Sequence, residues 1–311
     1  MEKMTKEDLV YRQNLPLDIK VEMTKNRNRE WVWYYGKNNV YVSFSGGKDS
    51  TVLLHLVRQE FPSIPAVFVN TGLEFPELVD FVKKQENVTI LRPEMSFYEV
   101  IKKYGYPVIS KEQANYIYQI RHSTENMKKI RLEGRKGRYK LSKKYYYLLD
   151  APFEISSECC RIMKKEPIRK YEKETGKMPI VGTMAEESLL REQSYLKNGC
   201  NSFDSKRPVS TPMGFWKQED VLQYILENKL EIASVYGEIE KDAFGKLTTT
   251  GCKRTGCIYC GFGAQQEIVP TRYQLLEKTH PQLYKYCMET LGFKEVCKFM
   301  KIPYKNPKII E

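Results

Sequence analysis

Residues 43–50 read SFSGGKDS, between the strand-like run NNVYV and the helix-like run TVLLHLVRQ. A plain surface turn needs one Gly, or an Asn-Gly pair, to reach its backbone angles, so the other polar residues need a further reason. A Gly-rich turn between a strand and a helix directs several backbone N–H groups and the positive helix end at one point, which favours an anion. The sequence therefore predicts that residues 45–50, called here the phosphate loop, bind a phosphate group.

The residue types in the phosphate loop fit this interpretation. The two glycines let the backbone approach a ligand closely, the two serines offer hydroxyls, and Lys48 adds positive charge. We expect Asp49 to cap the following helix or to orient a metal ion. The spacing matches neither G-x-x-x-x-G-K-[ST] nor G-x-G-x-x-G, so those two nucleotide motifs are not expected.

The surrounding sequence predicts an α/β fold. Residues 1–38 have helical spacing and end near Gly36, a favourable residue at a helix C-terminus. Strand and helix patterns then alternate, with strands expected at 39–44, 64–72 and 87–93 and helices at 49–61 and 76–85. Such alternation with short connections indicates βαβ units on a parallel sheet.

The rest of the chain suggests three consecutive segments. A loop and then a helix are expected within 153–176, a strand from 178 and a helix within 215–229, then a Gly/Cys loop at 248–263 and further helices. We expect an N-terminal helical segment (1–38), a nucleotide-binding α/β domain (39–235) with a basic insert (121–147), and a Cys-containing loop with a C-terminal helical region (236–311).

Composition points to a cytoplasmic protein with a polyanionic partner. The N-terminus is charged and has no apolar signal segment, and no apolar run approaches the ~20 residues of a membrane span, so no membrane partner is expected. The 51 Lys and Arg against 39 Asp and Glu give a net charge of +12. A charge of this sign indicates either solubility alone or binding to nucleic acid. The eight cysteines are clustered, which in a cytosolic chain favours metal or redox chemistry over disulfides.

Several motifs, in order, resemble a known family. The string SGGKDS is similar to the pyrophosphatase loop of the PP-loop ATP pyrophosphatase superfamily, whose members cut ATP between the α and β phosphates. FVNTGLEFPEL, ECCRIMKKEPIRKY, VGTMAEESLLREQS and PMGFWKQEDVLQYI resemble segments of the sulfonucleotide (phosphoadenylyl-sulfate and adenylyl-sulfate) reductases, over roughly residues 40–265. The resemblance implies a parallel-sheet PP-loop domain of the adenine-nucleotide α-hydrolase type, with helical additions at both ends.

The resemblance also implies a nucleotide site. It would bind ATP or adenylyl sulfate with Mg²⁺, and Lys48, Asp49 and Lys164 are the implied catalytic residues. The implied nucleotide-binding residues are Ser43, Ser45, Gly46, Gly47, Lys48, Asp49, Ser50, Asn70, Thr71, Gly72, Glu77, Gly182 and Arg191.

The cysteine pattern resembles that of the iron–sulfur members of the family. An adjacent pair, Cys159 and Cys160, followed by a distant C-x-x-C, Cys257 and Cys260, implies the ligands of a [4Fe–4S] cluster. Thiolates are soft ligands and suit iron–sulfur chemistry. Two alternatives remain open: Cys252 replaces one ligand or delivers sulfur, or the C-x-x-C is half of a structural zinc site. Three other cysteines are expected to be ordinary core or surface thiols, namely Cys200, Cys287 and Cys297.

Three departures from the reductase pattern affect the expected reaction. No cysteine follows Cys297, whereas the reductases carry a nucleophilic cysteine in a C-terminal tail; we therefore expect little or no adenylyl-sulfate reduction. Asn70 stands where an acidic residue is common, and Met184 stands where relatives carry an arginine, although Arg191 remains.

An ATP or adenylyl site beside a cluster on a basic protein also resembles the sulfur-inserting branch, namely tRNA thiolation and DNA phosphorothioation enzymes. This resemblance implies an enzyme that adenylates a substrate, releases pyrophosphate and allows sulfur insertion. A sulfonucleotide reductase is the first alternative, and a non-catalytic nucleotide- and DNA-binding regulator is the second, against which the intact phosphate loop counts. A sulfur donor or a reductase protein is an expected partner.

The insert is the expected surface for tRNA or DNA. Ten Lys or Arg lie in residues 121–147 with only Glu125 and Glu133 among them. Within 128–147 the side chains expected to meet phosphates are Arg131, Arg135, Lys136, Arg138, Lys143 and Lys144, and Tyr145, Tyr146 and Tyr147 are expected to stack on bases. A solvated loop with its tyrosines packed underneath is the alternative.

Overall fold

The computed structural model describes residues 4–307, and the first three and last four residues of the chain lie outside this description. Contacts divide the described chain into two compact units that interleave along the sequence. The first unit comprises residues 4–70, Glu74–Arg92 and Ile168–Thr255, and the second comprises Thr71–Leu73, Pro93–Pro167 and residues 256–307. The three consecutive segments expected from the sequence stay a prediction.

The first unit is built on a mostly parallel sheet, which confirms the predicted α/β class. Its strand order is β3-β2-β1-β5-β7-β6, and only the β6–β7 pair is antiparallel. The strands are β1 (Val40–Ser43), β2 (Ala66–Val69), β3 (Val88–Leu91), β5 (Met178–Val181), β6 (Asn201–Ser202) and β7 (Val209–Ser210). In the central strand β1, Tyr41 and Val42 face opposite sides of the sheet and are both fully buried, because a parallel sheet covered on both faces has no solvent side.

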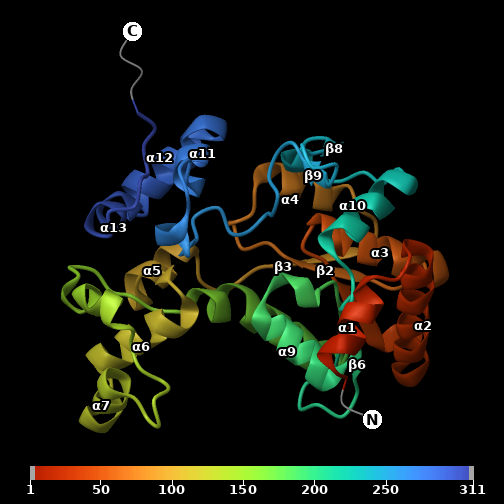
Figure 1. Cartoon of the computed structure of the whole chain (residues 1–311), viewed down its shortest axis with the longest axis horizontal. Coiled ribbons are helices and arrows are strands. Elements are labelled where there is room, and N and C mark those ends of the chain that lie inside the picture. Colours follow the sequence, from red (N-terminus) through yellow and green to blue (C-terminus); the bar gives the residue numbers. More distant parts are fainter. Residues whose placement is uncertain (1–3, 308–311) are drawn as a thin grey trace. The chain divides into compact units, whose positions relative to one another are not determined.

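Helices cover this sheet. They are α1 (Lys6–Gln13), α2 (Leu17–Tyr35), α3 (Lys48–Glu60), α4 (Pro76–Lys83), α8 (Glu166–Thr175, in this unit from Ile168), α9 (Leu189–Asn198) and α10 (Gln218–Glu227). Helix α3 packs against α2 and α10 (Figure 1). The predicted C-terminal glycine of the first helical segment is confirmed, because α2 ends at Gly36 with a φ of +85°. A hairpin of β8 (Ile239–Lys241) and β9 (Leu247–Thr249) completes the unit.

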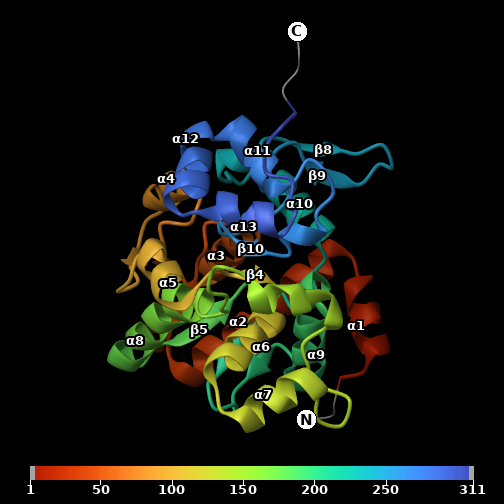
Figure 2. The same ribbon diagram turned by 90° about the vertical axis from the view of Figure 1, so that its left-hand side faces the viewer.

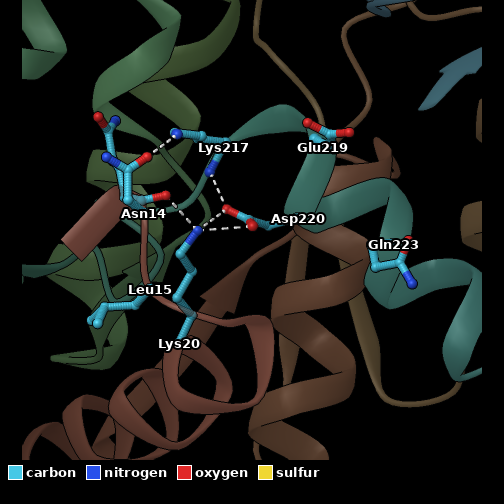
Figure 3. Close-up of a pocket in the computed structure, with 8 residues that line it drawn as sticks. Asn14, Leu15, Lys20, Lys217, Glu219, Asp220 and Gln223 are labelled. Atoms are coloured by element: carbon cyan, nitrogen blue, oxygen red, sulfur yellow. Dashed lines mark hydrogen bonds and ion pairs between the residues drawn. The ribbon is translucent and has the colours of Figure 1, made fainter. Parts of the chain in front are cut away.

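A buried ion pair joins α2 to the start of α10. The Lys20 Nζ lies 2.8 and 2.7 Å from the two carboxylate oxygens of Asp220 and also donates to the Gln13 carbonyl (Figure 3). Beside it, Lys217 Nζ donates to Asn14 Oδ1 at 2.7 Å. These residues line a cavity of about 280 Å³ between α1, α2, the turn joining them and the start of α10. The N-terminal helices are therefore an integral part of the first unit.

The second unit is mainly helical. Its helices are α5 (Phe97–Tyr104), α6 (Lys111–His122), α7 (Glu125–Glu133), α11 (Arg272–Thr279), α12 (Pro281–Lys285) and α13 (Phe293–Phe299), with a 3-10 segment at Lys143–Asp150 and π-helical turns at Arg161–Lys165 and Tyr286–Thr290. Figure 2 shows α11, α12 and α13 grouped together. The short strands β4 (Val108–Ile109) and β10 (Gly261–Phe262) pair in parallel.

No helix within residues 4–307 is long and apolar enough to cross a membrane.

Candidate phosphate loop and cysteine group

The phosphate loop follows the carboxyl end of β1 and leads directly into α3. In the sheet, β2 lies on one side of β1 and β5 on the other, so the strand order reverses at β1. In open α/β sheets ligands bind at the carboxyl ends of strands where the order reverses. Gly182, which follows β5, lies there too: a Cβ at this residue would be 3.2 Å from the Asp49 carbonyl oxygen. The predicted residues after β1 and β5 are therefore brought together.

Glycine is required at Gly46 for two reasons. Its φ is +72°, which L side chains rarely adopt. A Cβ there would also lie 2.6 Å from Leu78 Cδ2 and Val82 Cγ2 of α4. At Gly47, the residue before α3, a Cβ would lie 3.2 Å from the Tyr236 hydroxyl. The loop backbone is thus fitted between α4 and Tyr236.

The two serines brace the loop from within. Ser45 Oγ and Ser50 Oγ lie 3.1 Å apart, and the Ser45 amide donates to Ser50 Oγ at 3.2 Å. Ser50 Oγ donates to the Gly47 carbonyl at 2.8 Å, and the Gly47 amide donates to Ser45 Oγ at 3.3 Å. The hydroxyls expected to face a phosphate therefore also hold the loop in shape.

Lys48 and Asp49 lie at the start of α3. The Lys48 ammonium is almost fully buried, donates to the Lys253 carbonyl at 3.0 Å and lies 5.3 Å from the Tyr236 ring centre. Burial lowers the pKa of Lys48, and the charge of Asp49 opposes that shift. Because Gly47 is the capping residue, Asp49 does not cap α3. Its Oδ1 lies 3.7 Å from Lys48 Nζ and, among the described residues, is buried without a hydrogen-bond partner, which suits a cation ligand.

The sequence pattern did not indicate the residues that contact the loop from the C-terminal part of the first unit. The Lys48 amide donates to the Tyr236 hydroxyl at 3.3 Å, and that hydroxyl lies 2.7 Å from Thr255 Oγ1. Lys253 supplies the carbonyl that Lys48 binds. These residues lie about 190 to 210 positions from the loop, so no local pattern indicates them.

Arg191 lies at the start of α9, where its guanidinium forms an ion pair with Glu187. Arg254, which the sequence analysis did not single out, forms an ion pair with the same carboxylate. Burial, then the charge of Arg254, lowers the pKa of Arg191, while the charge of Asp49 opposes the shift. Met184, in place of the family arginine, is buried in the core.

The remaining predicted nucleotide residues are spread over both units. Ser43 ends β1 opposite Val67 and Val181, and Asn70 follows β2. In the second unit, Thr71 Oγ1 accepts from the Leu73 amide at 3.2 Å, and Gly72 has a φ of +73°. Glu77 is in the first turn of α4.

The cysteine group, defined as Cys159, Cys160, Cys257 and Cys260, lies within the second unit. The Sγ atoms of Cys159 and Cys160 are 3.9 Å apart. The pKa of Cys159 is raised by this hydrogen bond, by burial and by the charges of the other three thiols. The same hydrogen bond, with the charges of Lys111 and Lys164, lowers the pKa of Cys160 against the effect of burial. Lys164, predicted to be catalytic, therefore lies beside this group.

The four cysteines fit an iron–sulfur cluster for two reasons. Thiolates are the usual ligands of such clusters, and the other three thiols lie close enough to raise the pKa of Cys159. Within residues 4–307, no three or more His, Cys, Asp or Glu side chains are arranged to hold one metal ion. A [4Fe–4S] cluster places each thiolate on a different iron, so its ligands need not surround one ion. Cys252 lies in the first unit, where burial and then Glu77 raise its pKa. Cys200, Cys287 and Cys297 are buried core thiols, as expected.

The basic insert combines exposed and internally bound cations. Arg131 donates to Gln119 Oε1 at 2.6 Å and to the Tyr139 carbonyl at 3.0 Å, so it is engaged within the unit. The exposed cations are Lys129, which pairs with Glu133, and Arg135, Lys136, Arg138, Lys140, Lys143 and Lys144. The expectation that all three tyrosines can stack on bases is wrong for Tyr145, which is buried, while Tyr147 stacks on Phe299. This part of the insert packs as the solvated-loop alternative describes.

Comparison with known proteins identifies the family. The model of the phosphoadenosine phosphosulfate reductase domain matches residues 39–137 and 110–261. An adenosine 5'-phosphosulfate reductase of Staphylococcus epidermidis is 30% identical over 238 residues, covering 74% of each chain. An uncharacterized protein of Methanocaldococcus jannaschii is 25% identical over 87% of this chain, which spans 49% of that protein's length.

Among solved structures, a phosphoadenylyl-sulfate reductase from Candida auris has 17% identity and a TM-score of 0.40, over 79% of this chain and 98% of that one. A similarity of that size adds nothing to the assignment, which rests on the domain match and on the relative from Staphylococcus epidermidis. The chain has a mostly parallel sheet, and its phosphate loop lies where the strand order reverses. Together with these matches, this shows that the chain belongs to the phosphoadenosine phosphosulfate reductase domain family, within the PP-loop superfamily.

Proposed function

We propose that the chain binds ATP or an adenylyl nucleotide with its pyrophosphate end on the amides of Gly46 and Gly47. The observation that carries this proposal is the loop geometry: a positive φ at Gly46, the capping position of Gly47 and the start of α3 lie together where the strand order reverses. Backbone amides and a helix N-terminus at such a point favour a phosphate group.

The proposed reaction is adenylation followed by sulfur insertion. An oxygen of the substrate attacks the α-phosphorus of ATP, the bond between the α-phosphorus and the bridging oxygen breaks, and pyrophosphate leaves. A sulfur nucleophile from a donor then displaces AMP. Lys48 and the loop amides stabilise the charge of the leaving pyrophosphate. Asp49, with its buried Oδ1, would hold the Mg²⁺ that neutralises the same group.

The cysteine group is proposed to hold a [4Fe–4S] cluster. Four thiols that influence one another's pKa, two of them adjacent in the chain, support a shared site. A bound cluster would supply a place to hold or activate sulfur. The chain itself contributes the thiolates, with Lys111 and Lys164 favouring the ionised form of Cys160.

The proposed acceptor is a nucleic acid, tRNA or DNA, bound on the exposed cations of residues 128–147. Their exposure and the net charge of +12 support this choice. A cytoplasmic location and a sulfur-donor or reductase partner complete the proposal.

A second candidate function is reduction of adenylyl sulfate or phosphoadenylyl sulfate. It is favoured by the match to the reductase domain and by the 30% identity to a reductase over 74% of this chain. The loop would then hold the phosphosulfate, and the cysteine would come from the chain or from a partner.

One experiment separates the two functions. Protein purified without oxygen is incubated with ATP and tRNA, DNA or no acceptor, and pyrophosphate is measured; in parallel, it receives adenylyl sulfate and a thioredoxin system, and sulfite is measured. The first proposal predicts acceptor-dependent pyrophosphate and little sulfite. Sulfite at an enzyme-like rate without pyrophosphate release would instead establish the reductase.

A further inference from the structure

A short segment of the first unit, residues 253–255, packs directly onto the phosphate loop. The Lys253 carbonyl accepts a hydrogen bond from Lys48 Nζ at 3.0 Å. Thr255, the next residue after Arg254, is hydrogen-bonded through its Oγ1 to the Tyr236 hydroxyl. If Gly47 carried a Cβ, that atom would lie 3.5 Å from the same Oγ1. Both neighbours of Arg254 therefore touch the site, which fixes the backbone of Arg254 beside the loop.

The Arg254 side chain is held by a shared acidic residue. Glu187 forms ion pairs with both Arg254 and Arg191, and its Oε2 accepts from the Met184 amide at 2.9 Å. The Glu187 side chain is only 12% exposed, whereas those of Arg254 and Arg191 are 60% and 43% exposed. One fixed carboxylate thus orients two guanidinium groups that solvent can still reach.

The charges in this region exceed what Glu187 neutralises. Burial, then the charge of Arg254, lowers the pKa of Arg191, and for Lys48 the charge of Arg254 adds to the effect of burial against that of Asp49, so Arg254 lies close enough to repel both cations. Glu187 and Asp49 leave one positive charge in excess among these five groups. A bound anionic group would relieve this repulsion.

We propose that Arg254 and Arg191, oriented by Glu187, form an anion subsite for the oxygens beyond the α-phosphate, namely the β- and γ-phosphates of ATP or the sulfate of adenylyl sulfate. Guanidinium groups bind such oxygens through paired, charge-assisted hydrogen bonds. This inference rests on the proposed nucleotide binding at the phosphate loop, since Arg254 lies beside Gly47 and Lys48. It assigns to Arg254 a role parallel to that of Arg191, and Glu187 is a positioning residue.

The test compares ATP and AMP binding by titration calorimetry in the parent and in Arg254→Ala. Removal of a charge-assisted hydrogen bond predicts that ATP affinity falls about 10- to 100-fold. AMP lacks the distal oxygens and therefore has no hydrogen bond to Arg254 to lose, so its affinity is expected to change less than about twofold. Arg254→Lys keeps the charge but not the paired geometry and is expected to recover only part of the ATP affinity.

Arg207→Ala is a matched control. Arg207 pairs with Glu172 in the same unit, at 2.5 Å, with exposures of 50% and 15% that resemble those of Arg254 and Glu187. It should leave ATP affinity unchanged. Unaltered ATP affinity in Arg254→Ala, or an equal fall in affinity for ATP and AMP, would overturn the subsite. Absence of ATP and adenylyl-sulfate binding in the parent would overturn the nucleotide proposal itself, so the two failures are distinguishable.

Discussion

The phosphate loop and the cysteine group are assembled in different ways. The loop is six consecutive residues whose shape is set by its own hydrogen bonds, by α4 and by Tyr236. The cysteine group joins residues about 100 positions apart, and its thiols raise the pKa of Cys159 rather than stabilise its charge. The comparison teaches that contacts within the protein hold the loop in shape, whereas four neighbouring thiols that disfavour one another's ionisation gain most from a bound metal.

The largest expected effect is on the cysteine group. Protein made without oxygen should contain about 4 iron and 4 sulfide per chain for a [4Fe–4S] cluster. Cys257→Ser should reduce iron to near zero, because three remaining thiolates hold a cluster poorly. Iron analysis and the visible spectrum measure this, with Cys200→Ala, a core thiol of the first unit, as the control.

Stoichiometric zinc without iron in the anaerobic parent would contradict this prediction and favour a structural zinc site.

The next prediction tests whether packing against α4 determines the shape of the loop. Gly46→Ala should destabilise the chain by about 2–4 kcal/mol, because it adds a backbone strain at φ +72° and an overlap with Leu78 and Val82. Gly176→Ala has a similar φ of +69° with open space around it, and should cost only about 1 kcal/mol. Urea unfolding of both variants gives the two free energies. Equal destabilisation of the two variants would show that α4 does not shape the loop.

A third effect concerns the exposed cations of the second unit. Replacing Arg135, Lys136 and Arg138 together with Ala should lower the log–log salt dependence of tRNA or DNA binding by about two to three units, at ~0.7–0.9 per phosphate contact. ATP affinity should not change. Filter binding over a range of salt measures the slope, and Lys37→Ala, on the first unit, is the control. Identical slopes in parent and triple variant would leave the insert as a solvated loop.

The smallest effect is expected at the residue that closes the loop. Tyr236→Phe removes a hydroxyl that accepts from the Lys48 amide and bonds Thr255, which should cost about 1 kcal/mol of stability and a few-fold in ATP affinity. Tyr224→Phe, which removes a hydroxyl 2.9 Å from His55 Nδ1, should alter stability only. An unchanged ATP affinity in Tyr236→Phe would mean that the loop keeps its shape without this hydrogen bond.

Local patterns predicted the α/β fold and placed the phosphate loop between a strand and a helix. The strands and helices through residue 93, the strand at 178 and the helix within 215–229 were predicted from short apolar runs and from helical spacing, and their alternation predicted the parallel sheet. Helices α5, α6, α7 and α9 were not among the expected elements, although the buried Phe97, Val100 and Ile101 of α5 have ordinary helical spacing.

The partners of the site were beyond such reasoning. Tyr236 and Lys253 contact Lys48, and Arg254 pairs with Glu187, only through the tertiary fold, and no spacing in the sequence relates these three residues to the loop. The same limit explains why the burial of Tyr145 was not predicted, because that burial depends on tertiary packing and not on the basic residues around it in the sequence.

The most direct test of the account is ATP titration of the parent and of Lys48→Ala/Asp49→Ala by calorimetry, with Asp49→Asn as a variant that keeps the shape of the loop. We predict one ATP site in the parent, no measurable binding in the double variant while its circular dichroism stays native, and weakened Mg²⁺-dependent binding in Asp49→Asn. Unchanged ATP affinity in the folded double variant would contradict the claim that residues 45–50 hold the nucleotide.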